Sequence, residues 1–204
     1  MRTSRSTTAP SRSWSRARRG GDLRVLGIDP GSRYCGFGVV EDAGGSVVRH
    51  VDHGVVAVAD AGRIEARLAA LHAALARALE THRPDIVAVE EVFHARNARS
   101  AIVLGQARGV ALLAAAQAGV RVRSFAPAVI KQAVTGTGRA EKDQVGRMVC
   151  ILLGITVRER TDATDALAAA ICGVLRADER EDASGQPRSA DPRAALRRLA
   201  RGAR

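Results

Sequence analysis

The chain has 204 residues, 46% of them hydrophobic, and a net charge of +11, which together suit one folded domain with charged segments around it. Its three cysteines are an odd number without Cys-x-x-Cys spacing, which argues against a disulfide framework and a zinc knuckle and fits a reducing cytoplasm. No apolar run reaches the roughly 18 residues of a membrane span, so we expect a cytoplasmic protein without a membrane partner.

The first segment, residues 1–22, is rich in Arg and Ser and has neither apolar periodicity nor the apolar stretch of a signal peptide. We predict that it is a disordered basic leader. Regular structure is expected from Leu23, because residues 23–29 form a short apolar run that ends on an acid.

Three strands are predicted at the start of the folded part. The apolar run 23–29 is followed by a Pro-Gly turn, and residues 34–41 alternate as a strand does. A Gly44–Gly45 turn then leads to strand-like sequence through Val58. This order predicts an antiparallel meander.

Helices and strands alternate in the middle of the chain. Leucines at steps of three and four predict an amphipathic helix over 63–81, and residues 85–90 form a strand that is apolar throughout, as a strand covered on both faces should be. An Ala-rich helix is predicted over 97–118, with Gly105 and Gly109 available for close packing, followed by a strand over 120–125.

Three helices are predicted to complete the domain, over residues 127–134, 140–153 and 161–176. Residues 177–204 are dense in charge and are predicted to be a flexible tail. The order of elements predicts an α/β fold in which a five-stranded mixed sheet is flanked by helices, with the first, fourth and fifth strands parallel.

The positive charge of the folded part is concentrated in residues 96–147, where nine basic residues face two acids. The flanking segments carry the acids. A nuclease needs a carboxylate centre for metal ions beside a basic surface for phosphates, and this distribution suits one. A generic Arg-rich surface is the alternative that charge alone leaves open.

Four acids are candidates for such a centre. Asp29 and Glu90 end the first and fourth strands, and reactive groups of open α/β sheets lie beyond the carboxyl ends of parallel strands. Asp162 and Asp165 are three apart at the start of the last helix and share a face. Turn formation and helix capping also explain such acids one by one, but together they supply the oxygen ligands of a two-metal site. Glu91 should point away from Glu90.

Six motifs in order resemble the RuvC family of bacterial Holliday junction resolvases: G-I-D-P-G-S-R (27–33), E-E-V-F (90–93), A-R-N (95–97), L-G-Q-A-R-G (104–109), A-E-K (140–142) and D-A-T-D-A-L-A (162–168). The resemblance covers residues 23–176. It implies a ribonuclease-H-like fold, dependence on Mg²⁺ or Mn²⁺, two ions per site, and a homodimer that nicks a four-way DNA junction symmetrically. It also implies cooperation with the RuvA and RuvB branch-migration complex.

The resemblance also assigns residues. The four metal-binding acids of the family fall on Asp29, Glu90, Asp162 and Asp165. Its junction-contacting aromatic falls on Phe93, and its two DNA-contacting lysines fall on Lys131 and Lys142.

Two arginines, Arg96 in the A-R-N motif and Arg108 in the L-G-Q-A-R-G motif, are further candidates for DNA contact. Two features depart from the family. Glu91 stands where Gln is usual, and Leu23 stands where the initiator Met would be, so residues 1–22 are interpreted as a possible misassigned start.

Lys131 and Lys142 are the only lysines among 32 basic residues. A lysine retained among so many arginines suggests a place for a compact ammonium, although chance retention explains either one equally well. Both flank the loop between Gly136 and Gly138, which favours phosphate contact. Phe93 follows the fourth strand, where an aromatic ring can stack on an unpaired base or simply fill the core.

Three other functions were weighed. The G-I-D-P-G-S motif also resembles the phosphate loop of the sugar kinase, actin and chaperone ATPase superfamily, but those proteins need two such domains. A ribonuclease-H-like nuclease for RNA–DNA hybrids or linear DNA would share the metal chemistry. A DNA-binding module without catalysis would not need four acids.

Overall fold

A computed structural model describes residues 23–31, 33–45, 47–91, 98–157 and 161–177 of the chain, so the predicted leader and most of the predicted tail lie outside the described residues. The described strands are β1 (Arg24–Asp29), β2 (Tyr34–Asp42), β3 (Val48–Ala57), β4 (Ile86–Glu90) and β5 (Arg121–Phe125). The described helices are η1 (Ala59–Ala61), α1 (Ile64–His82), α2 (Ala98–Gln117), α3 (Pro127–Thr135), α4 (Lys142–Leu153) and α5 (Thr161–Leu175).

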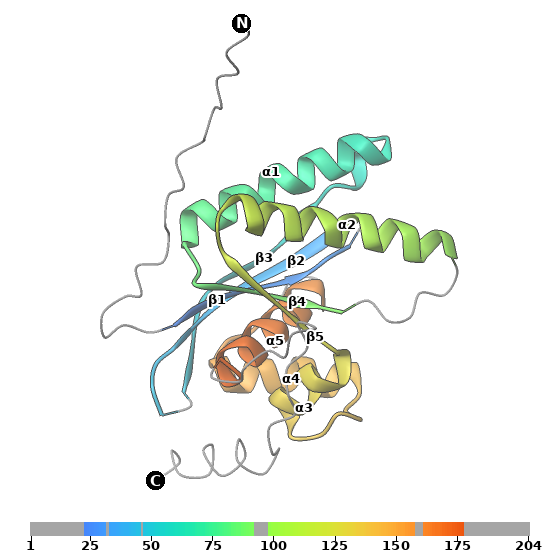
Figure 1. Cartoon of the computed structure of the whole chain (residues 1–204). Coiled ribbons are helices and arrows are strands. Elements are labelled where there is room, and N and C mark those ends of the chain that lie inside the picture. Colours follow the sequence, from blue (N-terminus) through green and yellow to red (C-terminus); the bar gives the residue numbers. More distant parts are fainter. Residues whose placement is uncertain (1–22, 32, 46, 92–97, 158–160, 178–204) are drawn as a thin grey trace, which may run out of the picture.

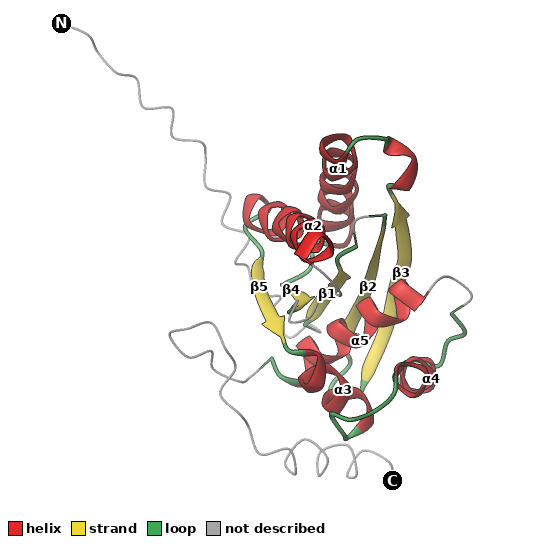
Figure 2. Cartoon of the chain, turned by 90° about the vertical axis from the view of Figure 1, so that its right-hand side faces the viewer, coloured by secondary structure: helices red, strands yellow, loops and turns green. Residues whose placement is uncertain are grey.

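The strands form one sheet in the order β3-β2-β1-β4-β5. β1, β2 and β3 pair antiparallel, whereas β4 runs parallel to β1 and β5 runs parallel to β4. This confirms the predicted five-stranded mixed sheet and its opening meander. Figure 1 shows the sheet between two layers of helices, with α1 and α2 on one face and α3, α4 and α5 on the other. The view turned by 90° in Figure 2 shows the same separation.

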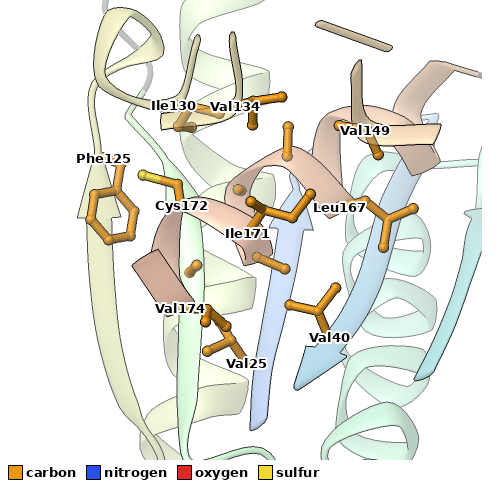
Figure 3. Close-up of a cluster of buried hydrophobic side chains, with 14 of the residues drawn as sticks. Val25, Val40, Phe125, Ile130, Val134, Val149, Leu167, Ile171, Cys172 and Val174 are labelled. Atoms are coloured by element: carbon orange, nitrogen blue, oxygen red, sulfur yellow. The ribbon is translucent and has the colours of Figure 1, made fainter. Parts of the chain in front are cut away.

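Each face of the sheet has its own apolar core. On the α1 and α2 side, Leu71, Leu75 and Leu79 of α1 are buried, and each fully buried leucine stabilises the fold by roughly 1.5–3 kcal/mol. The core on the other face is built around α5, whose Leu167 and Ile171 lie among side chains of the sheet, α3 and α4 (Figure 3).

The apolar strand β4 explains how the two cores are separated. Ile86 and Ala88 belong to the core beneath α5, and Val87 and Val89 belong to the core beneath α1 and α2. Successive side chains of a strand point to opposite faces, so a strand covered twice has no polar face. The prediction made for residues 85–90 is confirmed.

Small differences from the predicted elements have local causes. The helix predicted from residue 140 begins at Lys142, because Glu141 is extended, with φ −72° and ψ 156°, and precedes the first helical turn. The pairing of β2 with β3 shifts between Val39 and Val40, which is a β-bulge. The 3-10 helix η1 was not predicted from the sequence.

Helix α2 corrects one expectation. By length and composition alone it could cross a membrane, because alanine and glycine fill the gaps between its stronger apolar residues. Its polar residues interrupt the apolar sequence, so α2 contains no unbroken apolar run of that length. In the structure Ala107, Ala111, Ala114 and Ala115 of this helix are buried in the core that α2 shares with α1.

Candidate active site

Two carboxylates end neighbouring strands of the sheet. Asp29 is the last residue of β1 and Glu90 is the last residue of β4. The two strands are parallel neighbours, with Ile28 opposite Val89, so both acids leave the sheet at the same edge. This is the edge at which open α/β sheets place their reactive groups.

Helix α5 brings two more carboxylates to this edge. Asp162 and Asp165 lie in its first turns, three residues apart, so they share one face of the helix. The backbone of α5 lies directly on the sheet, where an added Cβ at Gly36 or Gly27 would collide with helix carbonyl groups. Since Gly36 is paired with Asp29 across β1 and β2, the helix start lies over the end of β1.

The acids influence one another's ionisation. Burial, followed by the negative charges of Asp165, Glu90 and Asp162, raises the pKa of Asp29 to about 7. Burial and the charge of Asp165 also raise the pKa of Glu90, and burial raises the pKa of Asp165. Like charges at close range oppose ionisation. A cation bound among these groups would therefore stabilise their ionised forms.

A lysine side chain contacts this cluster directly. Lys142, the first residue of α4, places Nζ 2.5 Å from Oδ2 of Asp165. Burial opposes the charge of Lys142, but its hydrogen bond to Asp165 and the negative charges of the nearby acids together outweigh burial and raise the pKa of the ammonium. Lys142 and Lys131 both lower the pKa of Glu90, so the two ammonium groups act on the same edge.

The described side chains do not form a complete metal-binding site. Within the described ranges, no three Asp, Glu, His or Cys side chains lie close enough together to hold an ion as they stand. The donor set nonetheless suits a hard cation, because four carboxylates at one edge supply oxygen ligands and excess negative charge.

Two predicted DNA contacts, Phe93 and Arg96, lie outside the described residues. Another predicted contact, Arg108, is half-buried on α2, and one of its terminal nitrogens donates a hydrogen bond of 2.8 Å to Oγ of Ser124 on β5. This bond ties α2 to the end of β5. The structure therefore separates Arg108 from the lysines, which lie on α3 and α4.

Sequence reasoning missed two features of the site. Lys142 was predicted to contact phosphate, and its pairing with Asp165 was not foreseen because residues 142 and 165 are far apart in the chain. The contact of α5 with the sheet was also missed. A signal for it exists in the sequence, since Gly36 and Gly38 alternate in a strand and leave one face without side chains.

Comparisons with known proteins agree with this site. The family model described as crossover junction endodeoxyribonuclease RuvC matches residues 25–173. Crossover junction endodeoxyribonuclease RuvC of Myxococcus xanthus is 57% identical over 152 residues, which are 74% of this chain and 79% of that protein. The protein of the same name from Acidiphilium cryptum is 53% identical over 149 residues, which are 73% of this chain and 89% of that protein.

A solved structure agrees as well. Thermus thermophilus RuvC in complex with Holliday junction substrate superposes with a TM-score of 0.71 at 37% identity, covering 76% of this chain and 94% of that one. The likeness confirms the predicted ribonuclease-H-like fold. Because the family model spans most of the chain and the relatives match it at such identity, the chain belongs to the RuvC family of crossover junction endodeoxyribonucleases.

Proposed function

We propose that this chain is a Holliday junction resolvase, a structure-selective endonuclease that acts in homologous recombination and DNA repair by symmetric paired nicks. The observation that carries the proposal is the meeting of Asp29, Glu90, Asp162 and Asp165 at one edge of a ribonuclease-H-like sheet, in a chain of the RuvC family. The nuclease domain is assigned to residues 23–176.

RuvC nucleases are metal-dependent, and we assign the four acids as ligands of two Mg²⁺ ions, for which Mn²⁺ can substitute. When bound, such ions supply an activated water and stabilise charge on the scissile phosphate and the leaving 3′-oxygen. The raised pKa values of Asp29, Glu90 and Asp165 support this assignment, because crowded carboxylates gain most from a cation. The products are a 5′-phosphate and a 3′-hydroxyl.

The basic residues hold the DNA. Lys131 and Lys142 contact phosphates beside the acids. The ion pair between Lys142 and Asp165 would break when DNA and the metal ions bind. Phe93 stacks on a base at the junction centre, and Arg96 contacts the backbone nearby. Arg108 contributes a charge from α2 while Ser124 fixes its orientation.

A homodimer completes the enzyme. A four-way junction has near two-fold symmetry, so paired nicks need two sites related in the same way. Helix α2 carries a stripe of exposed apolar or small residues opposite its buried alanines: Ile102, Gly105, Gly109 and Leu113. No described atom of the chain lies within 4 Å of a Cβ added at either glycine, so a second α2 can approach there. Such a stripe is self-complementary.

The cellular setting follows from the substrate. Junctions form on chromosomal DNA, so we place the enzyme in the cytoplasm without a membrane partner. The RuvA and RuvB branch-migration complex would present it with junctions that move along homologous sequence.

The test is a cleavage assay with the purified protein and Mg²⁺ on three labelled substrates. We expect paired nicks on a four-way junction, with ends that ligase rejoins, and little cutting of linear duplex or of an RNA–DNA hybrid. Preferential cutting of the hybrid or the linear duplex would instead favour a ribonuclease-H-like nuclease of another kind. ATP hydrolysis without cutting would favour the sugar kinase and actin superfamily.

A further inference from the structure

The sheet beneath the start of α5 is lined with glycine. Gly36 is paired with Asp29 across the antiparallel strands β1 and β2, and Gly27 is paired with Gly38. Paired residues in an antiparallel sheet present their side chains to the same face, so Gly36 leaves an empty position beside the Asp29 carboxylate. The first turn of α5 fills that position.

The contact at Gly36 is with helix backbone. An ideal Cβ built there would lie 1.9 Å from the carbonyl oxygen of Asp162 and 2.4 Å from its carbonyl carbon. Gly27 repeats this contact one turn later, with a Cβ position 1.9 Å from the carbonyl oxygen of Ala166. A backbone carbonyl cannot rotate away as a side chain can, so any Cβ must lift the helix by about 1 Å or more.

The contacts become softer away from the acids. At Gly38 the nearest atoms are Cδ2 and Cγ of the Leu167 side chain, both at 2.7 Å, with its Cα at 2.9 Å. At Gly173, near the far end of α5, a Cβ would meet side-chain atoms of Val25 and Ala88, at 2.8 and 3.2 Å. The hardest contacts are therefore those beside Asp162 and Asp165.

We propose that Gly36, supported by Gly27 and Gly38, is a positioning residue of the metal site: it lets α5 lie on the sheet closely enough for Asp162 and Asp165 to share ions with Asp29. The inference rests on the proposed metal site and adds to it the residue that sets its dimensions. Metal ligands must be held to a fraction of an ångström, and a misplacement of 1 Å can cost about a hundredfold in rate.

The experiment compares Gly36→Ala with Gly173→Ala, which adds a methyl group between the same helix and the sheet at the other end of α5, from the helix side. Binding of Mn²⁺ to the full chain is measured by titration calorimetry, and the melting temperature is measured in EDTA and in excess Mn²⁺. We expect Gly36→Ala to bind Mn²⁺ at least about tenfold more weakly than the wild type and to lose the melting-temperature increase that Mn²⁺ gives. Gly173→Ala should melt lower in EDTA but bind Mn²⁺ like the wild type.

Equal Mn²⁺ affinity of folded Gly36→Ala and wild type would overturn the inference, as would an equal loss in Gly173→Ala. If Gly36→Ala does not fold, Gly38→Ala decides, because the atoms nearest its methyl group belong to the Leu167 side chain and the Leu167 Cα lies at 2.9 Å, against 1.9 Å for the carbonyl contact at Gly36. Weaker Mn²⁺ binding by Gly38→Ala than by Gly173→Ala supports the role, and wild-type binding by both rejects it. A wild-type chain that binds no Mn²⁺ and cuts no junction would instead reject the proposed function.

Discussion

Carboxylates at the two ends of strand β1 have opposite surroundings. Beside its start, Glu41 of β2 is 3% exposed and is paired with Arg24 of β1, whose Nε donates a hydrogen bond of 2.7 Å. Arg49 of β3 forms a second ion pair with Glu41, and Arg24 also donates to the carbonyl of His82 at 2.6 Å. The negative charge is matched, and three strands and the end of α1 are tied together.

At its other end, Asp29 lies near three more acids, and Lys142 and Lys131 are the described cations that lower pKa values in this cluster. Burial and like charges raise the pKa of Asp29 to about 7, which means that the fold disfavours the ionised form. A carboxylate kept only for stability would have a matched partner, as Glu41 has. The difference supports the proposal that the Asp29 end is kept for a ligand at a cost in stability.

The largest expected effect comes from removing one charge at the Asp29 end. Asp29→Asn or Glu90→Gln should reduce nicking by on the order of a thousandfold, because metal ions provide several kcal/mol of transition-state stabilisation. Junction binding should persist or tighten, since a negative charge near the phosphates is lost. Single-turnover nicking and a gel-shift assay in Ca²⁺ measure the two effects. Nicking at a rate within a few-fold of the wild type would show that these acids are not part of the active site.

The matching change at the start of β1 should affect stability and leave chemistry intact. Glu41→Gln removes one partner of a buried ion pair, which should lower the free energy of unfolding by about 3 kcal/mol. Denaturant melts in EDTA report this loss. Below the melting transition the variant should nick junctions at the wild-type rate, and a slow but stable variant would show that Glu41 communicates with the site.

Local sequence predicted most of the fold, because hydrophobic periodicity and turn residues act within one element. The strand 85–90 illustrates this, since a short apolar run without polar gaps is typical of a strand covered on both faces. The start of α4 was placed two residues early, because Glu141 favours a helix by composition but adopts extended backbone as the N-cap.

The site was predicted only as far as its acids. Strand ends identified Asp29 and Glu90, and helical spacing identified Asp162 and Asp165. The pairing of Lys142 with Asp165 depends on how α4 packs on α5, which no local pattern encodes. The closeness of α5 to the sheet likewise depends on atoms of Gly36 and Asp162 that are distant in sequence.

The raised pKa of Asp29 predicts a stability profile that Glu41 does not share. Its folded pKa of about 7 lies above the unfolded value of 3.8, so the folded state binds the proton more tightly. The stabilisation from this group is full below about pH 4 and is lost as pH rises through 7 in the absence of metal. Melting temperatures in EDTA should fall more steeply between pH 5 and pH 8 for the wild type than for Asp29→Asn. Parallel profiles would contradict the shift.

The smallest expected effect concerns the cations at the Asp29 end. If Lys131 and Lys142 only neutralise phosphates, Arg at either position should be nearly silent. We expect instead that Lys142→Arg and Lys131→Arg each slow single-turnover nicking by about tenfold, or 1.4 kcal/mol, while junction affinity changes little.

The structure gives the reason for Lys142. Its ammonium makes one contact with Asp165, whereas a guanidinium would grip that carboxylate with two parallel hydrogen bonds and hold it away from the metal ions. Lys142→Arg should therefore need more Mn²⁺ for half-maximal nicking, and excess Mn²⁺ should restore part of its rate. Lys131 interacts more weakly with the acids, because it lowers the pKa of Glu90 less than Lys142 does. Extra Mn²⁺ should therefore not rescue Lys131→Arg. Full-rate nicking by both variants on saturating junction would show that positive charge alone matters at this end of the sheet.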